Sequence, residues 1–206
     1  MALKFQFNKT AMQVLKKDLK VRERALPTLK AKETALRMEV KRAKDELKEA
    51  QLAFDAHKKV MLSYSDLWNE FPRDFLVVKD VDLSFRKIAG VKIPLLEGVE
   101  FAITQKVLFG LPAWVGSGVA ALKESAELSI KIDVAQKKVT VLEYARKKTT
   151  QKVNLYEKVQ IPELNDALRK IKRFLEDQEN LEKSSQKILK TKISAAEAAL
   201  ENEEAA

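Results

Sequence analysis

Few side chains in this sequence are of the types that carry out chemistry. Cysteine is absent and His57 is the single histidine, which excludes disulfides, thiolate metal sites and a histidine-rich metal centre. A Ser-His-Asp triad would have to use His57. None of the five glycines begins a GxxxxGK[ST] loop, so the phosphate cradle of P-loop enzymes is missing. We therefore expect no catalytic, cofactor-binding or metal-binding residues.

The remaining candidates are better explained by structure than by chemistry. Gly116-Ser117-Gly118 favours a flexible helix start or a close contact between helices over a ligand loop. Acidic residues are plentiful, but they fall mostly on the polar faces of predicted helices, and no isolated pair stands out as catalytic. The elements that would position any functional residue are therefore the more informative part of the sequence.

An apolar stripe from Met12 to Phe71 organises the chain. Its residues recur at alternating spacings of three and four over more than eight heptads, and Lys, Arg, Glu, Asp and Gln fill most of the positions between them. So narrow and long a stripe predicts a helix that packs against a partner helix along its length. The stripe consists of Met12, Leu15, Leu19, Arg22, Leu26, Leu29, Glu33, Leu36, Val40, Ala43, Leu47, Ala50, Phe54, His57, Met61, Tyr64, Trp68 and Phe71.

Three polar residues interrupt this stripe. Arg22 and Glu33 occupy seam positions, where polar residues commonly fix the register of a helix pair at some cost in stability. His57 also lies on the seam, which predicts a packed imidazole with a hydrogen-bond partner. A direct functional contact at Arg22 or Glu33 is the less favoured interpretation.

The ends of the first helix carry ordinary signals. Thr10 and Gln13 fit a capping box, after a loose lead-in over residues 1–9. Pro72 predicts an end near Phe71. Inside the helix, Pro27 lacks a backbone donor and is expected to cause a kink or a short interruption.

The central segment changes to a period of two. Val81, Leu83 and Phe85 alternate with polar residues, and a turn at Ala89-Gly90 leads to a second alternating run. Beyond Gly98 a third run holds Val99, Phe101 and Ile103, so two or three short strands in a meander are expected. Pro94 requires its strand to lie at an edge or to carry a bulge. One face should pack near Tyr64, Trp68, Phe71 and Trp114, and the other should remain open for a partner.

A second long helix is predicted to begin between Pro112 and Ser117. Its seam includes Arg146, which we expect to fix register, and it slips by one residue beside Pro162. The two seams read Leu128, Ile132, Ala135, Val139, Leu142, Arg146, Thr149, Val153 and Tyr156, then Ile161, Leu164, Leu168, Ile171 and Leu175.

Two long helices around a small sheet must run antiparallel. Counting outward from the turn, Pro27 and Pro162 fall at about the same height, which suggests a shared bend. The fold class is therefore mainly α, a long antiparallel two-helix coiled-coil hairpin with a small β segment in the middle. We divide it into a shaft of residues 10–71 and 117–193, a β-containing head of residues 72–116, and a frayed tail of residues 194–206.

Charge is spread unevenly along the chain. The formal net charge is +9, and residues 9–44 hold twelve Lys and Arg against four acids. Such a basic arm permits nucleic acid, an anionic membrane or an acidic protein surface as partner. A basic coiled-coil hairpin that binds nucleic acid, or a membrane-associated tether, is thus the alternative to a component of a protein complex. No recognised nucleic-acid motif and no large apolar helix face supports either.

One long motif in the second helix resembles a known family. The run Thr149-Thr150-Gln151-Lys152-Val153-Asn154-Leu155-Tyr156-Glu157-Lys158-Val159-Gln160-Ile161-Pro162-Glu163 is similar to the signature of the D subunit of V/A-type rotary ATPases. Residues 29–36 and 88–94 resemble the family's first-helix motif and central segment. The resemblance covers essentially the whole chain, and Leu26-Pro27-Thr28 departs from the uninterrupted helix expected there.

The resemblance implies a rotor shaft. In that family the terminal helices insert into a hexamer of catalytic A and non-catalytic B subunits, and the central part lies beside the small F subunit. The shaft sits on the d-type (C) subunit that caps the membrane ring. The chain would then be a non-enzymatic subunit that couples ATP hydrolysis or synthesis to ion transport. It would be cytoplasmic and peripheral to the membrane, without membrane insertion and without a nucleic-acid partner.

Overall fold

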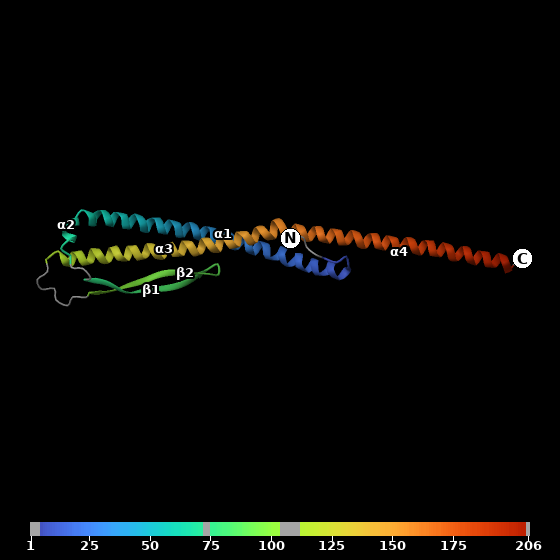
Figure 1. The fold of residues 1–206 in the computed structure, drawn as a ribbon, viewed down its shortest axis with the longest axis horizontal. Helices are drawn as coiled ribbons and strands as arrows, with labels where there is room; N and C mark the ends of the chain where they lie inside the picture. The colour runs from blue at the N-terminus through green and yellow to red at the C-terminus, as the bar shows by residue number, and fades with distance from the viewer. Residues whose placement is uncertain (1–4, 72–74, 104–111, 205–206) are drawn as a thin grey trace. The chain divides into compact units, whose positions relative to one another are not determined.

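The computed structural model describes residues 5–71, 75–103 and 112–204. Figure 1 shows the ribbon, in which long helices dominate. Contacts divide the chain into two units, which are described separately: unit 1 holds residues 1–29 and 152–206, and unit 2 holds residues 30–151. The elements are α1 (Lys9–Leu62), α2 (Ser65–Trp68), β1 (Leu76–Ile88), β2 (Val91–Ile103), α3 (Val115–Leu155), the π-helical turn η1 (Tyr156–Gln160) and α4 (Ile161–Glu204).

In unit 2, α1 and α3 form the predicted antiparallel pair. Residues that rise in number along α1 meet residues that fall along α3: Glu33 bonds with Thr150, Lys44 with Glu143, and His57 with Ala121. The seam residues make the core, as heptad spacing requires. Its buried members are Leu36, Val40, Ala43, Val139, Leu142 and Ile93.

The central segment is a single two-stranded antiparallel hairpin. Its turn is the predicted Ala89-Gly90, with φ of 49° and 80°. Of the two or three strands expected, the structure has two, because β2 continues through Gly98, which pairs with Asp82 beside a β-bulge. Pro94 pairs with Phe85 in a sheet of two strands, so it lies in an edge strand as expected.

The hairpin packs against the helices at both of its ends (Figure 1). At its open end, Phe75 and Leu76 contact Phe71, Trp114 and Val115, close to where the prediction placed them. At its turn, Ile88, Val91 and Ile93 join the core around Val40 and Leu142, a contact that the sequence had not indicated. Burial at both ends stabilises a hairpin that would be marginal by itself.

α1 ends nine residues before the predicted Phe71, at Leu62. The last carbonyls are bonded by both backbone and side chains. Val60 O accepts from Ser63 N–H and, at 2.6 Å, from Ser63 Oγ, and Met61 O accepts from Tyr64 N–H and, at 3.1 Å, from Trp68 Nε1. These bonds satisfy acceptors that a continuing helix would have used. Pro72, the predicted cause of the end, lies outside the described residues.

In unit 1, α1 pairs with α4. Leu15 is buried with Leu164, Ala167 and Ile171. The capping box at Thr10 is wrong, because Asn8 Oδ1 accepts the Ala11 N–H at 2.6 Å and thus caps the helix. The lead-in, where it is described, is not loose: the Phe7 ring lies 5.0 Å from that of Phe174, between centroids.

The two prolines of unit 1 behave differently. The interruption expected at Pro27 is wrong, because α1 is helical from Lys9 to Leu62 with Pro27 inside it. The slip predicted beside Pro162 is confirmed by the π turn η1, which ends two residues before that proline. The Arg22–Gln160 hydrogen bond gives the alignment of the two antiparallel helices. Five residues after Arg22 is Pro27, and five residues before Gln160 is Leu155, so Pro27 lies across from Leu155. The pair is therefore offset, and the shared bend stays a prediction.

Helix α4 extends to Glu204, and residues 205–206 lie outside the described residues. The frayed tail of residues 194–206 and the division into shaft and head stay predictions.

Candidate interaction surfaces

His57 is packed between α1 and α3, as the sequence predicted. Its Nε2 lies 3.0 Å from Ala121 O, so the tautomer with hydrogen on Nε2 donates to that carbonyl. Its Nδ1 lies 3.7 Å from Glu124 Oε2, and the imidazole is 13% exposed. His57 therefore joins the two helices near the α1–α2 end of unit 2.

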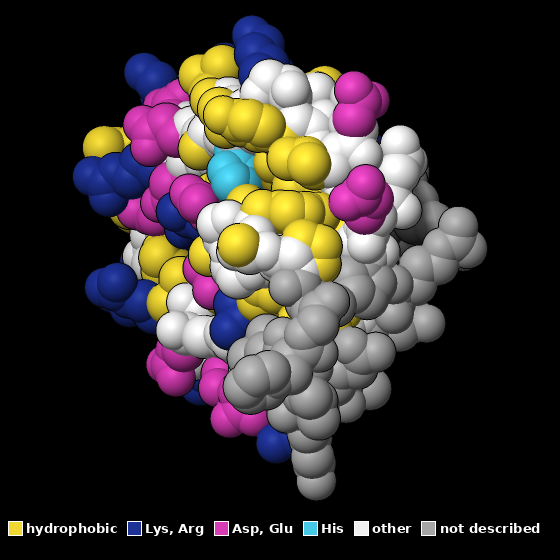
Figure 2. All heavy atoms as spheres, turned by 90° about the vertical axis from the view of Figure 1, so that its left-hand side faces the viewer, with side chains coloured by type: hydrophobic (Ala, Val, Ile, Leu, Met, Phe, Trp, Pro, Cys, Tyr) yellow, Lys and Arg dark blue, Asp and Glu magenta, His cyan; other side chains and the backbone are white. Residues whose placement is uncertain are grey.

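An apolar pocket of about 310 Å³ lies beside His57. Figure 2 shows hydrophobic side chains gathered around the histidine on this face. The Trp68 and Trp114 rings form one wall, edge to face, with centroids 5.7 Å apart. Most of the remaining lining is apolar or aromatic, and Ser117 adds a hydroxyl; these residues are Val60, Met61, Tyr64, Leu67, Ser117, Gly118 and Ala121. Such a pocket suits the packing of a partner's side chain better than a reaction.

Gly116-Ser117-Gly118 lies in the first turn of α3, as expected of a helix start. Ser117 Oγ donates to Trp114 O at 2.7 Å. A Cβ built at Gly118 would lie 2.9 Å from Trp114 Cζ3, whereas one at Gly116 meets nothing within 4 Å. The close approach of the indole therefore favours glycine at position 118. Trp114 directly precedes α3, so this contact lies at the start of one helix and is not the predicted contact between helices.

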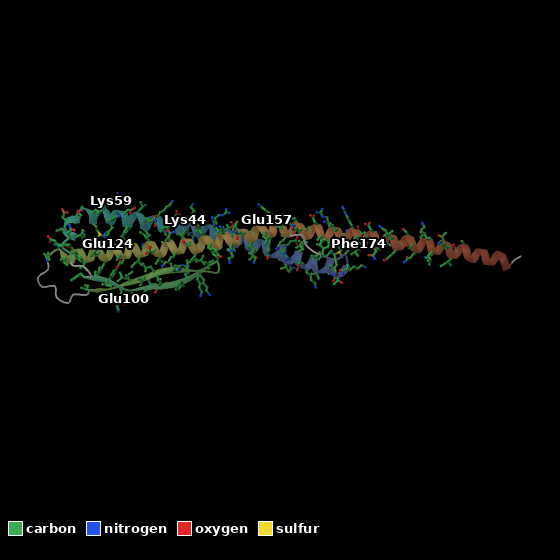
Figure 3. The ribbon with its side chains drawn as sticks, viewed as in Figure 1. Lys44, Lys59, Glu100, Glu124, Glu157 and Phe174 are labelled. Carbon is green, nitrogen blue, oxygen red and sulfur yellow. The ribbon has the colours of Figure 1, made fainter. Side chains whose placement is uncertain are left out.

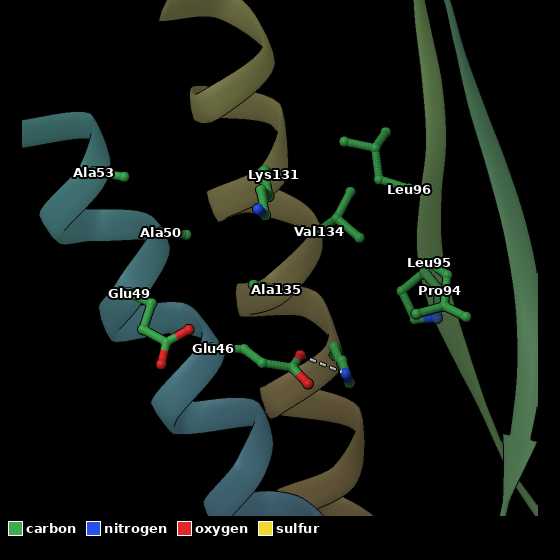
Figure 4. Close-up of a pocket in the computed structure, with 11 residues that line it drawn as sticks. Glu46, Glu49, Ala50, Ala53, Pro94, Leu95, Leu96, Lys131, Val134 and Ala135 are labelled. Atoms are coloured by element: carbon green, nitrogen blue, oxygen red, sulfur yellow. Dashed lines mark hydrogen bonds and ion pairs between the residues drawn. The ribbon is translucent and has the colours of Figure 1, made fainter. Parts of the chain in front are cut away.

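A second hollow, of about 450 Å³, separates β2 from α1 and α3 (Figure 4). Three small apolar residues are part of its lining: Ala50, Ala53 and Ala135. Lys138 Nζ, from α3, lies 2.6 Å from Glu46 Oε2, from α1. The sequence had not singled out Lys138, which is adjacent to the seam residue Val139 and is buried to 9% exposure.

The outer side of the hairpin leaves large apolar side chains in solvent. Phe85 is 68% exposed and Leu83 41% exposed, both on β1. On the same hairpin, Lys79 Nζ pairs with Glu100 Oε2 at 3.3 Å across the two strands. An edge strand with exposed apolar residues is a typical docking surface.

In unit 1, α4 carries apolar side chains that stay exposed beyond Phe174 (Figure 3). Leu181, Ile188, Leu189 and Ile193 are each about half or more exposed. Leu181 and Ile188 follow Phe174 at intervals of seven, so they lie along one face of the helix. The predicted seam had ended at Leu175, before these residues.

The polar seam residues bridge the helices within each unit. Arg22 Nε donates to Gln160 Oε1 at 2.9 Å, and Glu33 Oε1 accepts from Thr150 Oγ1 at 3.2 Å. Lys44 donates to Glu143 at 2.6 Å. This hydrogen bond, together with the charges of Lys44 and Arg146, lowers the pKa of the Glu143 carboxyl. Cross-helix bonds to Arg22 and Glu33 agree with their predicted role in register.

The described ranges hold neither a metal cluster nor a membrane span. No group of three or more His, Cys, Asp or Glu there could hold a metal ion. No helix in that part of the chain has the length and apolar character needed to cross a membrane.

The long motif of the second helix contains both Thr150, bonded to Glu33, and the π turn η1. A family model described as the D subunit of ATP synthase matches residues 11–191. The chain belongs to the family of ATP synthase D subunits.

Relatives of similar length agree with this assignment. The chain is 30% identical to the V-type ATP synthase D subunit of Borreliella burgdorferi, over 92% of this chain and 95% of the relative. It is 27% identical to the protein of the same name from Chlamydia caviae, over 94% of this chain and 95% of the relative. The family match spans almost all of α1, the hairpin, α3 and most of α4.

Proposed function

We propose that this chain is the non-catalytic central-stalk subunit, or rotor shaft, of a V/A-type rotary ATPase. It would couple ATP hydrolysis or synthesis in a catalytic hexamer to ion translocation by rotation. The observation that carries the proposal is the antiparallel helix pairing within each unit of a chain that belongs to this family. A helix pair locked by seam packing and cross-helix bonds resists twisting, as a shaft must.

The exposed surfaces suggest where partners bind. The apolar face of α4 after Phe174 would lie inside the hexamer of A and B subunits. The outer residues of the hairpin, Leu83 and Phe85, would dock the small F subunit. The ring-capping d-type subunit would bind at the pocket beside His57. The chain would thus be peripheral to the membrane, held there by its complex.

A pull-down from the native cell tests the proposal, with mass spectrometry of what the tagged full-length chain retains. We expect the A, B and F subunits to co-purify. Leu83→Ser with Phe85→Ser should lose F and keep A and B, whereas Leu181→Ser with Ile188→Ser should lose A and B and keep F. Leu52→Ser is the matched control, because Leu52 is 69% exposed on α1 outside these surfaces.

Each outcome bears on a separate part of the proposal. Recovery of none of these subunits with the unmodified chain would contradict the stalk assignment as a whole. Retention of F by the hairpin variant would show that the hairpin is not its docking surface. Circular dichroism of each variant checks that the helices remain folded.

A further inference from the structure

The π turn between α3 and α4 holds one residue more than an α-helical turn. Ile161 N–H bonds to Tyr156 O, five residues back rather than four. Pro162 follows at once, and it has no N–H to give to the carbonyl four residues before it. A wider turn just before Pro162 leaves more room between the proline ring and the carbonyl of Lys158, four residues earlier.

The extra residue sets which face of α4 meets α1. Each residue turns an α-helix by about 100°. Val153 before the π turn and Leu164 after it are both buried in unit 1. Because the π turn absorbs one residue, Leu164, Ala167 and Ile171 lie about 100° from where an unbroken α-helix of the same sequence would place them. The π turn therefore determines that these three residues, and not others of α4, face α1.

Arg22 holds the last residue of this turn from the opposite helix. Its Nε donates to Gln160 Oε1 at 2.9 Å. Its Nη1 donates to Asp18 O at 3.0 Å and lies 3.5 Å from Asp18 Oδ2. The Arg22 side chain is 27% exposed. Its contacts with Asp18 hold it on its own helix, and its Nε–H is directed to the π turn.

We propose that Arg22 is a latch that fixes the extra residue at Tyr156–Gln160. When the latch is open, the extra residue can migrate along the helix, and each residue that it passes turns by about 100° relative to α1. The π turn is thus a position at which one helix can change its rotation relative to α1, and the Arg22 side chain of α1 restrains it. It depends on the packing of unit 1 and not on the proposed function.

Hydrogen exchange on the full-length chain tests the latch. Arg22→Met should speed exchange of the amides of Gln160, Ile161, Glu163 and Leu164 at least tenfold. Gln160→Leu should do the same, and the double variant should add little, because both changes break one bond. Arg24→Met, at an exposed position two residues away, is the control and should change these rates less than twofold.

Amides around Val40 and Ala43 in unit 2 provide an internal reference. Unchanged rates at Gln160–Leu164 in Arg22→Met would overturn the proposal. A rise of equal size in both units would also overturn it, because that result reports general destabilisation and not release of a joint.

A deletion tests the phase argument with a different measurement. The chain lacks cysteine, so Leu164→Cys or Leu142→Cys introduces a single thiol at a buried position. Deleting Val159 removes the residue that the π turn absorbs, so the turn should become α-helical, Leu164 should keep its orientation, and the thiols at positions 164 and 142 should both stay protected. Labelling at position 164 that is at least tenfold faster with the deletion than without it would show that the turn does not absorb an extra residue.

Discussion

Lys138 Nζ lies 2.6 Å from Glu46 Oε2 and thereby joins α3 to α1 within unit 2. The two ends of this ion pair differ sharply, since the Lys138 side chain is 11% exposed and that of Glu46 is 55% exposed. In the described part of the chain, no other charged residue is as buried as Lys138. A buried ammonium is costly unless it stays paired, so the pair makes the alignment of the two helices specific.

Removing Glu46 should therefore cost more than removing Lys138. Glu46→Ala leaves a buried ammonium without its partner and should lower the free energy of unfolding by about 2 kcal/mol, less than a fully buried pair because Glu46 faces solvent. Lys138→Met keeps the aliphatic stem and should cost less than about 1 kcal/mol. Urea unfolding measures both. Glu49→Ala, on the same groove, is the control and should stay within about 0.5 kcal/mol; the reverse order would contradict this account.

The two glycines of the first turn of α3 should respond in opposite directions to alanine. Gly118→Ala drives a methyl group against Trp114, whose ring is packed by Trp68 and Phe71, and should cost about 1–3 kcal/mol. Gly116→Ala meets open space and should gain about 0.5–1 kcal/mol through helix propensity. Thermal unfolding of the two variants measures both changes in stability. Equal effects of both changes would show that the Trp114 contact is not tight.

The helix pairing of unit 2 can be captured covalently. Ala43 and Leu142 are fully buried in one cluster, so Ala43→Cys with Leu142→Cys should oxidise to a disulfide within one chain. Ala43→Cys with Val141→Cys should react far more slowly, because Val141 is 38% exposed and lies off the seam. Non-reducing electrophoresis reads the result. A product of twice the mass, linked through position 43 alone, would contradict the hairpin.

The Glu143 carboxyl should titrate below its ordinary pKa of 4.5, because Lys44 donates a hydrogen bond to its charged form. A lowered pKa in the folded state contributes stability above the unfolded-state pKa, and that contribution is lost as the pH falls through the folded value. In Lys44→Met the carboxyl should titrate at higher pH, as carbon-detected NMR can measure, with Glu143→Gln to assign the signal. Lys41→Met, at an exposed position on the same helix, should leave the midpoint unchanged. A midpoint unmoved by Lys44→Met would refute the assignment.

Regular periodicity carried most of what could be predicted of the fold. The heptad stripe indicated α1 and its partner, and Ala89-Gly90 indicated the hairpin turn, because both depend on neighbours in sequence. The slip in the seam beside Pro162 likewise predicted the disturbance that the structure shows as η1.

Contacts between distant residues were not readable in this way. Just after the end of α1 at Leu62, the Trp68 indole donates back to Met61 O, and the apolar pattern of the sequence does not encode that bond. Gly98 left open whether two or three strands form, because the sequence does not show that a bulge beside Asp82 lets β2 continue through this glycine. The alternation in β1 predicted a strand but not which apolar residues would be left uncovered, so Phe85 emerged as a docking candidate only from its exposure.

The burial of Leu15 among Leu164, Ala167 and Ile171 has a consequence for synthesis on the ribosome. About 150 residues separate the two halves of this contact, and at 5–20 residues per second the first half waits roughly 8–30 s for the second. During that interval α1 has emerged with its apolar stripe unpaired. The twelve Lys and Arg among residues 9–44 surround the stripe with charge, and like charges on neighbouring nascent chains repel. The basic arm would thus protect the newborn chain from aggregation until its own second helix arrives.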